Sequence, residues 1–419
     1  MDREMSGMKF TLNQNIWFGN EPVEIDVPDE WDVSFHTIPG DDLPGLTVPQ
    51  IREKLQKPYG IKPLSELAKG KKKVCIVFDD LTRPTPARPM AQAVLEELQD
   101  AGVDRESIIF LCALGTHGAL NRLDFVAKLG EDIVANYGVF NHNCYENCVS
   151  IGTTKKGYDV KINRELMTCD LKIGLGGMAP HAFNGFSGGG KILLPGLGHI
   201  DTIEQNHRTA IEYLTDNGIN FAEVMGHIEH DGMRSEIEEM ALMVGEFFKV
   251  DCIYNTRLEI VDIFAGHIID EYYACAERAR ALYATPRVKD LDVCIANANS
   301  KASEASIATS MALISTKESG GDIVIVNSAP SGQVTHYLMG YFGKETQGRI
   351  RGHATDRRPW GKTILFSPYP EYTAKLHLDG VRDFVHCATW KDVLSELSHV
   401  KGSARVGILA DATMQYYVD

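Results

Sequence analysis

Short apolar runs rich in β-branched residues alternate with amphipathic helical patterns along most of the chain. Residues 87–102 and 270–284 carry apolar side chains at helical spacing. Runs that are apolar throughout and alternate with helices are typical of parallel sheets covered by helices on both faces. The sequence therefore predicts an α/β protein, with strands at 74–80, 107–114, 170–177, 249–255, 291–299, 321–329, 362–367, 382–388 and 404–411.

The alternation restarts at Leu291, after a predicted helix and the polar link TPRVKD. We therefore expect two domains, residues 1–286 and 287–419, each with a mainly parallel sheet flanked by helices; the last residues can pack back on the first domain. Up to about residue 60 the chain is Pro-rich, which predicts short strands and an extended arm. Ligands of such folds bind beyond the carboxyl ends of strands, so we expect the active site in the cleft between the domains.

Charge and cysteine usage restrict the partners and the compartment. The formal net charge of −15 argues against nucleic acid or an anionic membrane as partner, because phosphates attract excess Lys and Arg. The nine cysteines are scattered singly, which favours reduced thiols over a disulfide framework. The start MDREMSGMKF has no apolar core of a signal peptide, and no apolar run reaches 18 residues. We expect a cytoplasmic protein.

Two predicted strand ends carry polar residues. In FDDLTRPTP (78–86), Asp80 and its neighbour Asp79 can accept hydrogen bonds, and Thr82 and Arg83 can hold a phosphate or carboxylate. The alternative is an acidic turn that caps the following helix. In LCALGTHGAL (111–120), His117 follows a strand, although a lone loop histidine is more often structural.

Residues 174–207 form the densest stretch, GLGGMAPHAFNGFSGGGKILLPGLGHIDTIEQNH, with three histidines, one lysine and nine glycines. Glycines allow close backbone approach and positive φ, and their N–H groups can line an anion-binding nest. We expect a helix to begin at DTIE, with Asp201 as its cap and Glu204 completing a capping box. The alternative is a glycine-rich connection whose histidines are incidental.

Other functions remain open at this point. GFSGGGKI nearly matches a phosphate-binding P-loop, but Ile192 has no hydroxyl for magnesium, and PHAFN separates the loop from its strand. A P-loop-like nucleotide-binding protein is therefore one alternative. A nicotinamide-dependent 2-hydroxy acid dehydrogenase is another, although the G-x-G-x-x-G turn is missing; a cofactor-free hydro-lyase is a third. His142, Cys144 and Cys148 suggest zinc only weakly, because no second pair follows at zinc-site distance.

Seven motifs occur in one order: FDDLTRP, LGTH, NH (141–142), PH (180–181), GFSGGGK, PG (195–196) and NH (206–207). In this order and spacing the chain resembles the nickel-dependent lactate racemase family, over most of residues 74–207. The resemblance implies Ni²⁺ in a nickel pincer nucleotide, a pyridinium-3-thioamide-5-thiocarboxylic acid mononucleotide made by separate cofactor-synthesis enzymes. It also implies that Lys191 binds the cofactor covalently, that His207 binds nickel, and that His117 and His181 transfer protons. The residues implied to hold the mononucleotide are Asp80, Leu81, Thr82, Arg83, Gly188, Gly189 and Gly190.

The implied reaction is the racemisation or epimerisation of a 2-hydroxy acid. Removing the α-hydrogen as a proton is difficult beside an anionic carboxylate, whereas removing it as hydride avoids a carbanion. One base is then needed for each enantiomer, which two histidines can supply.

The substrate clamp departs from the family pattern. Many lactate racemases carry Tyr-Gln-x-x-Lys early in the second domain, where this chain has Ser306, Ile307 and Ser310, with Lys301 offset. We therefore expect a 2-hydroxy acid other than lactate. Expected substrate contacts are Arg83, Lys301 and Trp360, while His336 and His353 are more readily structural.

Overall fold

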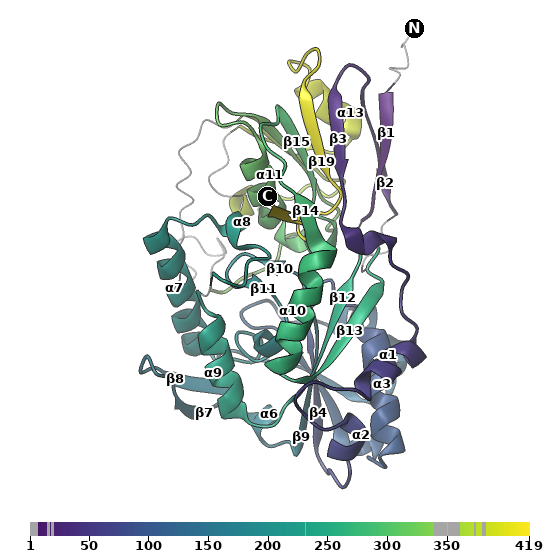
Figure 1. The fold of residues 1–419 in the computed structure, drawn as a ribbon, viewed down its shortest axis with the longest axis vertical. Helices are drawn as coiled ribbons and strands as arrows, with labels where there is room; N and C mark the ends of the chain where they lie inside the picture. Colours follow the sequence, from purple (N-terminus) through teal and green to yellow (C-terminus); the bar gives the residue numbers. More distant parts are fainter. Residues whose placement is uncertain are drawn as a thin grey trace. The chain divides into compact units, whose positions relative to one another are not determined.

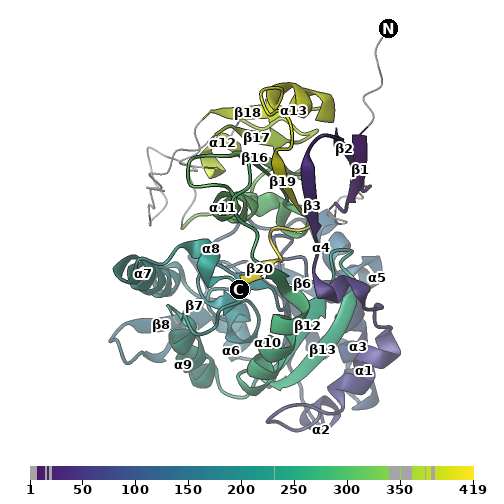
Figure 2. The ribbon, with the colours of Figure 1, turned by 45° about the horizontal axis from the view of Figure 1, so that its top comes forward.

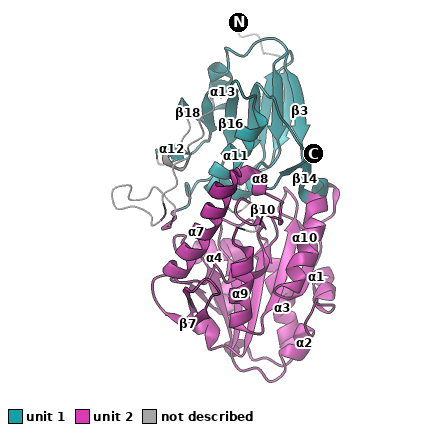
Figure 3. Ribbon diagram, turned by 60° about the vertical axis from the view of Figure 1, so that its left-hand side comes forward, with its two compact units in different colours: residues 1–41, 283–334, 351–419 teal, residues 42–282, 335–350 magenta. Residues whose placement is uncertain are grey.

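The structure is a computed structural model that describes residues 7–14, 17, 21–230, 232–338, 350, 361–372, 374–378 and 383–419. The chain forms two compact units (Figure 3). Unit 1 comprises residues 1–41, 283–334 and 351–419, and unit 2 comprises residues 42–282 and 335–350.

Unit 2 is built on a six-stranded sheet (Figure 1). Its strands, in spatial order, are β13 (Ile260–His267), β12 (Phe248–Tyr254), β9 (Leu171–Gly177), β4 (Val74–Asp79), β5 (Ile108–Ala113) and β6 (Gly138–Asn141). All neighbours are parallel except β12 and β13. The central strand β4 is buried along its whole length, as its continuous apolar sequence predicts.

Helices cover both faces of this sheet. On one face Phe78 of β4 packs against Phe125 of a helix, with ring centroids 6.1 Å apart. On the other face Cys75 and Val77 belong to a buried cluster with Leu193 and Ile237. The helices of unit 2 are α1 (Val48–Leu55), α2 (Leu64–Leu67), α3 (Ala87–Asp100), α4 (Arg122–Leu129), α5 (Glu131–Asn136), α6 (Arg164–Met167), α7 (Ile200–Asn217), α8 (Phe221–Val224), α9 (Arg234–Val244) and α10 (Asp270–Tyr283).

Short elements complete unit 2. Two antiparallel pairs are β7 (Cys148–Thr153) with β8 (Asp159–Asn163), and β10 (Pro180–His181) with β11 (Gly185–Phe186). Single 3-10 turns are η2 (Pro39–Asp42) at the unit boundary, η3 (Arg105–Ser107) and η4 (Gly189–Ile192).

Unit 1 contains a second six-stranded sheet in which every pairing is parallel (Figure 2). Its order is β18 (Phe384–Cys387), β17 (Thr363–Phe366), β16 (Asp322–Val326), β15 (Val293–Asn297), β19 (Arg405–Leu409) and β3 (Asp32–His36). The remaining elements are the pairs β1 (Gly7–Leu12) with β2 (Val23–Pro28) and β14 (Ala284–Pro286) with β20 (Tyr416–Val418), the turn η5 (Asn299–Glu304), and the helices α11 (Ser306–Ser315), α12 (Ala374–His377) and α13 (Trp390–Glu396).

The predicted fold class is confirmed: both large sheets are mainly parallel, and each predicted strand overlaps an observed one. The break between the units, at Leu282 and Tyr283, lies close to the predicted one after residue 286. Residues 1–41, which the prediction assigns to the first domain, cluster instead with unit 1, because β3 pairs with β19. The last strand, β20, pairs with residues 284–286. A site in a cleft between domains stays a prediction.

Candidate active site

Three adjacent strands of the unit 2 sheet deliver the candidate residues. β4 ends at Asp79, β5 at Ala113 and β9 at Gly177, and the three strands run parallel in the order β9, β4, β5. The carboxyl ends of parallel strands lie at one edge of a sheet, where ligands of such folds bind. The loops after these strands carry the polar motifs that the sequence singles out.

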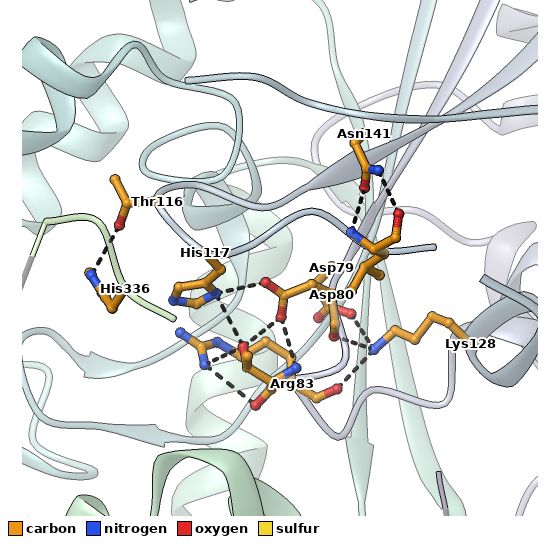
Figure 4. A network of polar contacts seen from close by, with 10 residues as sticks. Asp79, Asp80, Arg83, Thr116, His117, Lys128, Asn141 and His336 are labelled. Atoms are coloured by element: carbon orange, nitrogen blue, oxygen red, sulfur yellow. Dashed lines mark hydrogen bonds and ion pairs between the residues drawn. The ribbon is translucent and has the colours of Figure 1, made fainter. Parts of the chain in front are cut away.

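Asp80 and His117 form a close pair (Figure 4). Asp80 Oδ2 lies 2.7 Å from His117 Nδ1, and the backbone N–H of Thr82 donates to Asp80 Oδ1 at 2.8 Å. Burial alone would raise the pKa of Asp80, but His117, Arg83 and the Thr82 hydroxyl together lower it below its ordinary value. Ionised Asp80 therefore accepts Nδ1–H of His117, which leaves Nε2 of this ring with a lone pair.

A buried lysine fixes the loop that carries Asp80. Lys128 Nζ donates to the carbonyl oxygens of Asp80 at 3.0 Å and of Arg83 at 2.8 Å, and pairs with Asp79 Oδ1 at 2.7 Å (Figure 4). Asp79 also accepts the Thr85 hydroxyl at 2.5 Å. Burial raises the pKa of Asp79, although Lys128 acts against this rise. Asp79 thus stabilises the loop through Lys128 and Thr85, whereas Asp80 is the carboxylate that contacts His117.

A further histidine adjoins His117. The ring centroids of His117 and His336 are 5.0 Å apart, and Thr116 Oγ1 lies 3.2 Å from His336 Nδ1 (Figure 4). The backbone of Gly118 donates to the carbonyl of Thr335 at 3.2 Å. The sequence favours a structural role for His336, because no regular spacing marks this residue.

His181 and Lys191 meet on the loop after β9. His181 Nε2 lies 2.5 Å from Lys191 Nζ. The hairpin of β10 and β11 brings the histidine back toward the lysine, which sits in η4. An amine in contact with an imidazole is an arrangement suited to proton transfer or to nucleophilic chemistry.

Glycines 188 and 189 are required by packing and backbone shape. Gly188 has φ +85° and Gly189 has φ +53°, values that favour glycine. A Cβ on Gly188 would lie 2.7 Å from Asp251 Oδ2, which accepts the Gly189 N–H at 2.6 Å. Asp251 in turn pairs with buried Lys249. The glycine run is therefore packed against the carboxylate of Asp251. A role of Gly188, Gly189 and Gly190 in binding phosphate stays a prediction.

His207 lies on α7 and is buried. Its Nδ1 lies 2.9 Å from the carbonyl oxygen of Ile203, which can only accept, so Nδ1 carries the proton and Nε2 the lone pair. Burial lowers the pKa of His207 to about 4, and a positive charge on Lys191 or His117 would act in the same direction. The Phe183 ring lies between two histidines, with centroids 5.9 Å from His207 and 6.0 Å from His181. Contacts thus link His181 with Lys191 directly and with His207 through Phe183, while His117 lies near enough to His207 to influence its titration.

Unit 1 contains the remaining residues that are predicted to contact the substrate, and those that replace the family's substrate clamp. Lys301 is buried in η5, where its backbone N–H donates to the carbonyl oxygen of Ala298 at 2.8 Å. Ser306 begins α11, and its backbone carbonyl oxygen accepts a hydrogen bond from the Ser310 hydroxyl at 3.0 Å. Trp360 and His353 lie outside the described residues. Contact of Lys301 or Trp360 with substrate stays a prediction.

Two local predictions are corrected or resolved. α7 is capped by His199, whose Nδ1 accepts the Asp201 N–H at 3.2 Å, so the prediction of Asp201 as cap was wrong by two residues. η4 is a 3-10 turn and does not open an α-helix at Lys191, as a P-loop would require.

The zinc candidate has a structural explanation. His142 Nε2 lies 3.0 Å from the Gly198 carbonyl and its Nδ1 lies 3.0 Å from Asn163 Nδ2, while burial lowers its pKa to about 4. Among the described residues, no group of three or more His, Cys, Asp or Glu side chains is placed to hold a metal ion. A single histidine ligand such as His207 would depend on a cofactor for the other donors.

Sequence reasoning missed several residues around the site. Lys128 and Asp251 support the loops from a helix and from a strand, and Asn184 contacts His181. Their spacing in sequence carries no signal, because each acts through a tertiary contact. Of these residues, Asn184 alone stands out by composition, because it is the one polar residue in the run AFNGF.

The fold and the site define a class: an α/β protein with two histidines and a lysine at the carboxyl edge of a mainly parallel sheet. A family model, the lactate racemase N-terminal domain, matches residues 18–217. The predicted resemblance to the lactate racemase family is therefore confirmed, with the family model matching residues 18–217.

Two proteins similar to this chain in sequence are lactate racemases. The chain is 32% identical over 219 residues to lactate racemase of Thermoanaerobacterium thermosaccharolyticum, covering 52% of this chain and 50% of the relative. It is 28% identical over 289 residues to lactate racemase of Lactiplantibacillus plantarum, covering 67% and 66%. The matches thus span about half to two thirds of these relatives.

The fold resembles that of the lactate racemase apoprotein from T. thermosaccharolyticum, with TM-score 0.71, 22% identity and 98% and 100% of the two chains covered. A protein from Thermotoga maritima is also similar, with TM-score 0.64, 18% identity and 89% and 98% covered. Among the described residues, no helix combines the length and apolar character needed to cross a membrane.

Proposed function

We propose that this protein is an isomerase that racemises or epimerises a 2-hydroxy acid with a nickel pincer nucleotide. The observation that carries the proposal is the grouping of His117, His181, Lys191 and His207 in one region of unit 2, from four separate segments. The lactate racemase relatives support the same reaction class.

The residues present fit the implied cofactor. His207 donates its Nδ1–H to a backbone carbonyl, the arrangement that metal-binding histidines usually have, and its burial keeps the imidazole neutral above a pH of about 4. Lys191 would hold the cofactor covalently, and His207 would bind nickel through Nε2. Imidazole together with sulfur donors suits this metal. The loop from Asp80 to Arg83 and glycines 188–190 would hold the mononucleotide.

When bound, the nickel pincer would accept the α-hydrogen of the substrate as hydride and return it. His117 Nε2 would take the hydroxyl proton, because Asp80 fixes its tautomer and stabilises the imidazolium that forms. His181 would serve the opposite enantiomer. Arg83 would bind the carboxylate of the substrate or the phosphate of the cofactor. Lys301 and Trp360 are further candidates for substrate contact, and the altered clamp favours a substrate other than lactate.

The test is a panel of chiral 2-hydroxy acids, from lactate and malate to sugar acids, followed by polarimetry. The protein is first co-expressed with the cofactor-synthesis enzymes and supplied with nickel. A substrate deuterated at the α-carbon should keep its deuterium in the inverted product, because the hydrogen returns from the cofactor. Washout of the deuterium into solvent would indicate proton abstraction instead, and turnover of no compound by loaded enzyme would count against the assignment.

A further inference from the structure

We propose that Asn184 fixes the tautomer of His181 and thereby holds Lys191 as an uncharged amine before the cofactor binds. The inference rests on the proposed function in one respect, the assignment of Lys191 as the covalent attachment point. It concerns the protonation state of the apoprotein and involves neither nickel nor turnover.

The neighbours of Asn184 determine the orientation of its amide. The side chain is buried, with 1% exposure, between the Phe186 carbonyl oxygen, which can only accept, and the Arg234 guanidinium, which can only donate. The amide nitrogen therefore faces Phe186 O at 2.9 Å, and the amide oxygen faces Arg234 Nη2 at 3.0 Å. This orientation places the amide nitrogen 3.0 Å from His181 Nδ1, as a donor.

Arg234 makes this orientation rigid. Its Nη2 also donates to Phe186 O at 2.9 Å, and its guanidinium lies 3.8 Å from the centroid of the Tyr272 ring. A buried cation held by a carbonyl and an aromatic face has little freedom to turn. The opposite amide orientation of Asn184 would set two donors against each other and two acceptors against each other.

His181 Nδ1 therefore receives two donors. The backbone N–H of Phe183 points at the same atom, at 3.2 Å. A ring nitrogen that accepts carries a lone pair, so the one proton of neutral imidazole must be on Nε2. His117 has the opposite tautomer, because Asp80 accepts its Nδ1–H. The sequence alone does not distinguish the two histidines, whereas the hydrogen-bond partners of their Nδ1 atoms differ.

The tautomer of His181 sets the state of Lys191. Nε2–H of His181 faces Lys191 Nζ at 2.5 Å, so the lysine nitrogen must accept this hydrogen and cannot be an ammonium group. Only an uncharged amine has the lone pair that attacks a carbonyl carbon. An ordinary lysine with a pKa of about 10.4 is roughly 0.04% uncharged at pH 7, so a lysine held uncharged has a large reactivity advantage.

The experiment measures acetylation of the apoprotein by sulfo-N-hydroxysuccinimide acetate at pH 7, followed by peptide mass spectrometry. In this reaction the amine nitrogen bonds to the acetyl carbon, the carbon–oxygen bond to the hydroxysuccinimide breaks, and the amine proton passes to solvent. Lys57, whose side chain is 81% exposed, is the internal reference. We expect Lys191 to react at least about 10-fold faster than Lys57 despite its partial burial. A slower reaction would overturn the proposal.

Two variants test the role of Asn184. Asn184→Asp places a carboxylate where the amide donated, so His181 should move its proton to Nδ1, Lys191 should become charged, and its acetylation should fall at least about 10-fold. Asn121→Asp is the matched control, because Asn121 caps α4 by accepting Leu123 N–H at 2.8 Å. It should leave the rate at Lys191 unchanged. Equal rates in wild type and Asn184→Asp would overturn the proposal.

A second measurement does not depend on how well Asn184→Asp folds. Proton–nitrogen correlation spectra of the wild-type apoprotein, with ¹⁵N-labelled histidine, report which ring nitrogen carries the proton. The His181 signal is identified by its loss in His181→Gln. Protonated Nε2 is expected, and protonated Nδ1 would refute the inference. If neither the acetylation rates nor the protonated nitrogen of His181 is as expected, while loaded enzyme still inverts a substrate, only this inference is refuted. If both are as expected but loaded enzyme turns over no substrate, the proposed function is refuted.

Discussion

Acidification should destabilise the apoprotein through its buried His207. The pKa of His207 is lowered to about 4, chiefly by burial, against about 6.5 in an unfolded chain. The unfolded chain therefore binds a proton more readily between these values. The contribution of His207 to stability is fully present above pH 6.5 and is lost as the pH falls toward 4. Between pH 7 and pH 5 the loss amounts to about 2 kcal/mol.

The perturbation is His207→Gln, compared with wild type by urea denaturation at pH 7 and pH 5. The variant has no imidazole to protonate, so its loss of unfolding free energy between the two pH values should be smaller by about 2 kcal/mol. Carboxylates that titrate in the same range contribute equally to both proteins and cancel in the difference. His142, with a pKa also lowered to about 4 by burial, offers a matched comparison, and His142→Gln should show a reduction of similar size.

The reasoning would be refuted if His207→Gln lost as much stability as wild type between pH 7 and pH 5. Such a result would mean that the native protein protonates His207 without cost, so the ring would be solvated and not enclosed. The double variant with His142→Gln should reduce the loss by about 4 kcal/mol, because the two sites contribute separately.

Three further predictions concern the site. Asp80→Asn should lower kcat of loaded enzyme about 10²- to 10⁴-fold with little change in KM, since an amide N–H would reverse the His117 tautomer; steady-state kinetics with unchanged kcat would exclude this role. Lys191→Arg should abolish the cofactor mass increment in intact-protein spectra, whereas His207→Ala should keep the increment and lose nickel by elemental analysis; full nickel content would remove His207 as ligand. Gly188→Ala should lower the free energy of unfolding, measured by urea denaturation, by about 2–4 kcal/mol, because the added Cβ would lie 2.7 Å from a carboxylate oxygen of Asp251. The control is Gly157→Ala, at φ +88° with no atom within 4 Å of the added Cβ, which should lower it by about 1 kcal/mol. Equal losses in the two variants would contradict the packing argument.

The central strands of both large sheets were predictable because they are buried along their whole length. A run such as VCIVFD in β4 is buried at every position, so its sequence is apolar throughout and ends at polar Asp79 and Asp80. The same contrast marks the site, since an abrupt change from apolar to polar or glycine residues falls where a strand ends. The existence of the strands and the position of the polar loops therefore follow from local sequence.

Contacts between distant segments could not be predicted in this way. The short strand β3, in which no residue is fully buried, pairs with a strand more than 300 residues later, and no local pattern encodes that partner. The N-terminal cap of α7 could not be predicted either, because the His199 side chain accepts the backbone N–H of Asp201, a role that serine or aspartate usually has. Asn184 escaped notice because its role depends on Arg234 and Phe186, which fix its amide in space.

The pairing of β3 with β19 has a consequence for the order in which the protein can be completed during synthesis. Residues 42–282 of unit 2 are contiguous, so most of that unit can fold once they have left the ribosome. The sheet of unit 1 places β19, which is translated long after β3, between β15 and β3. The nascent chain must therefore carry β3 without its partner until β19 emerges, and during that interval the edge of β3 is open to chaperones or to neighbouring chains.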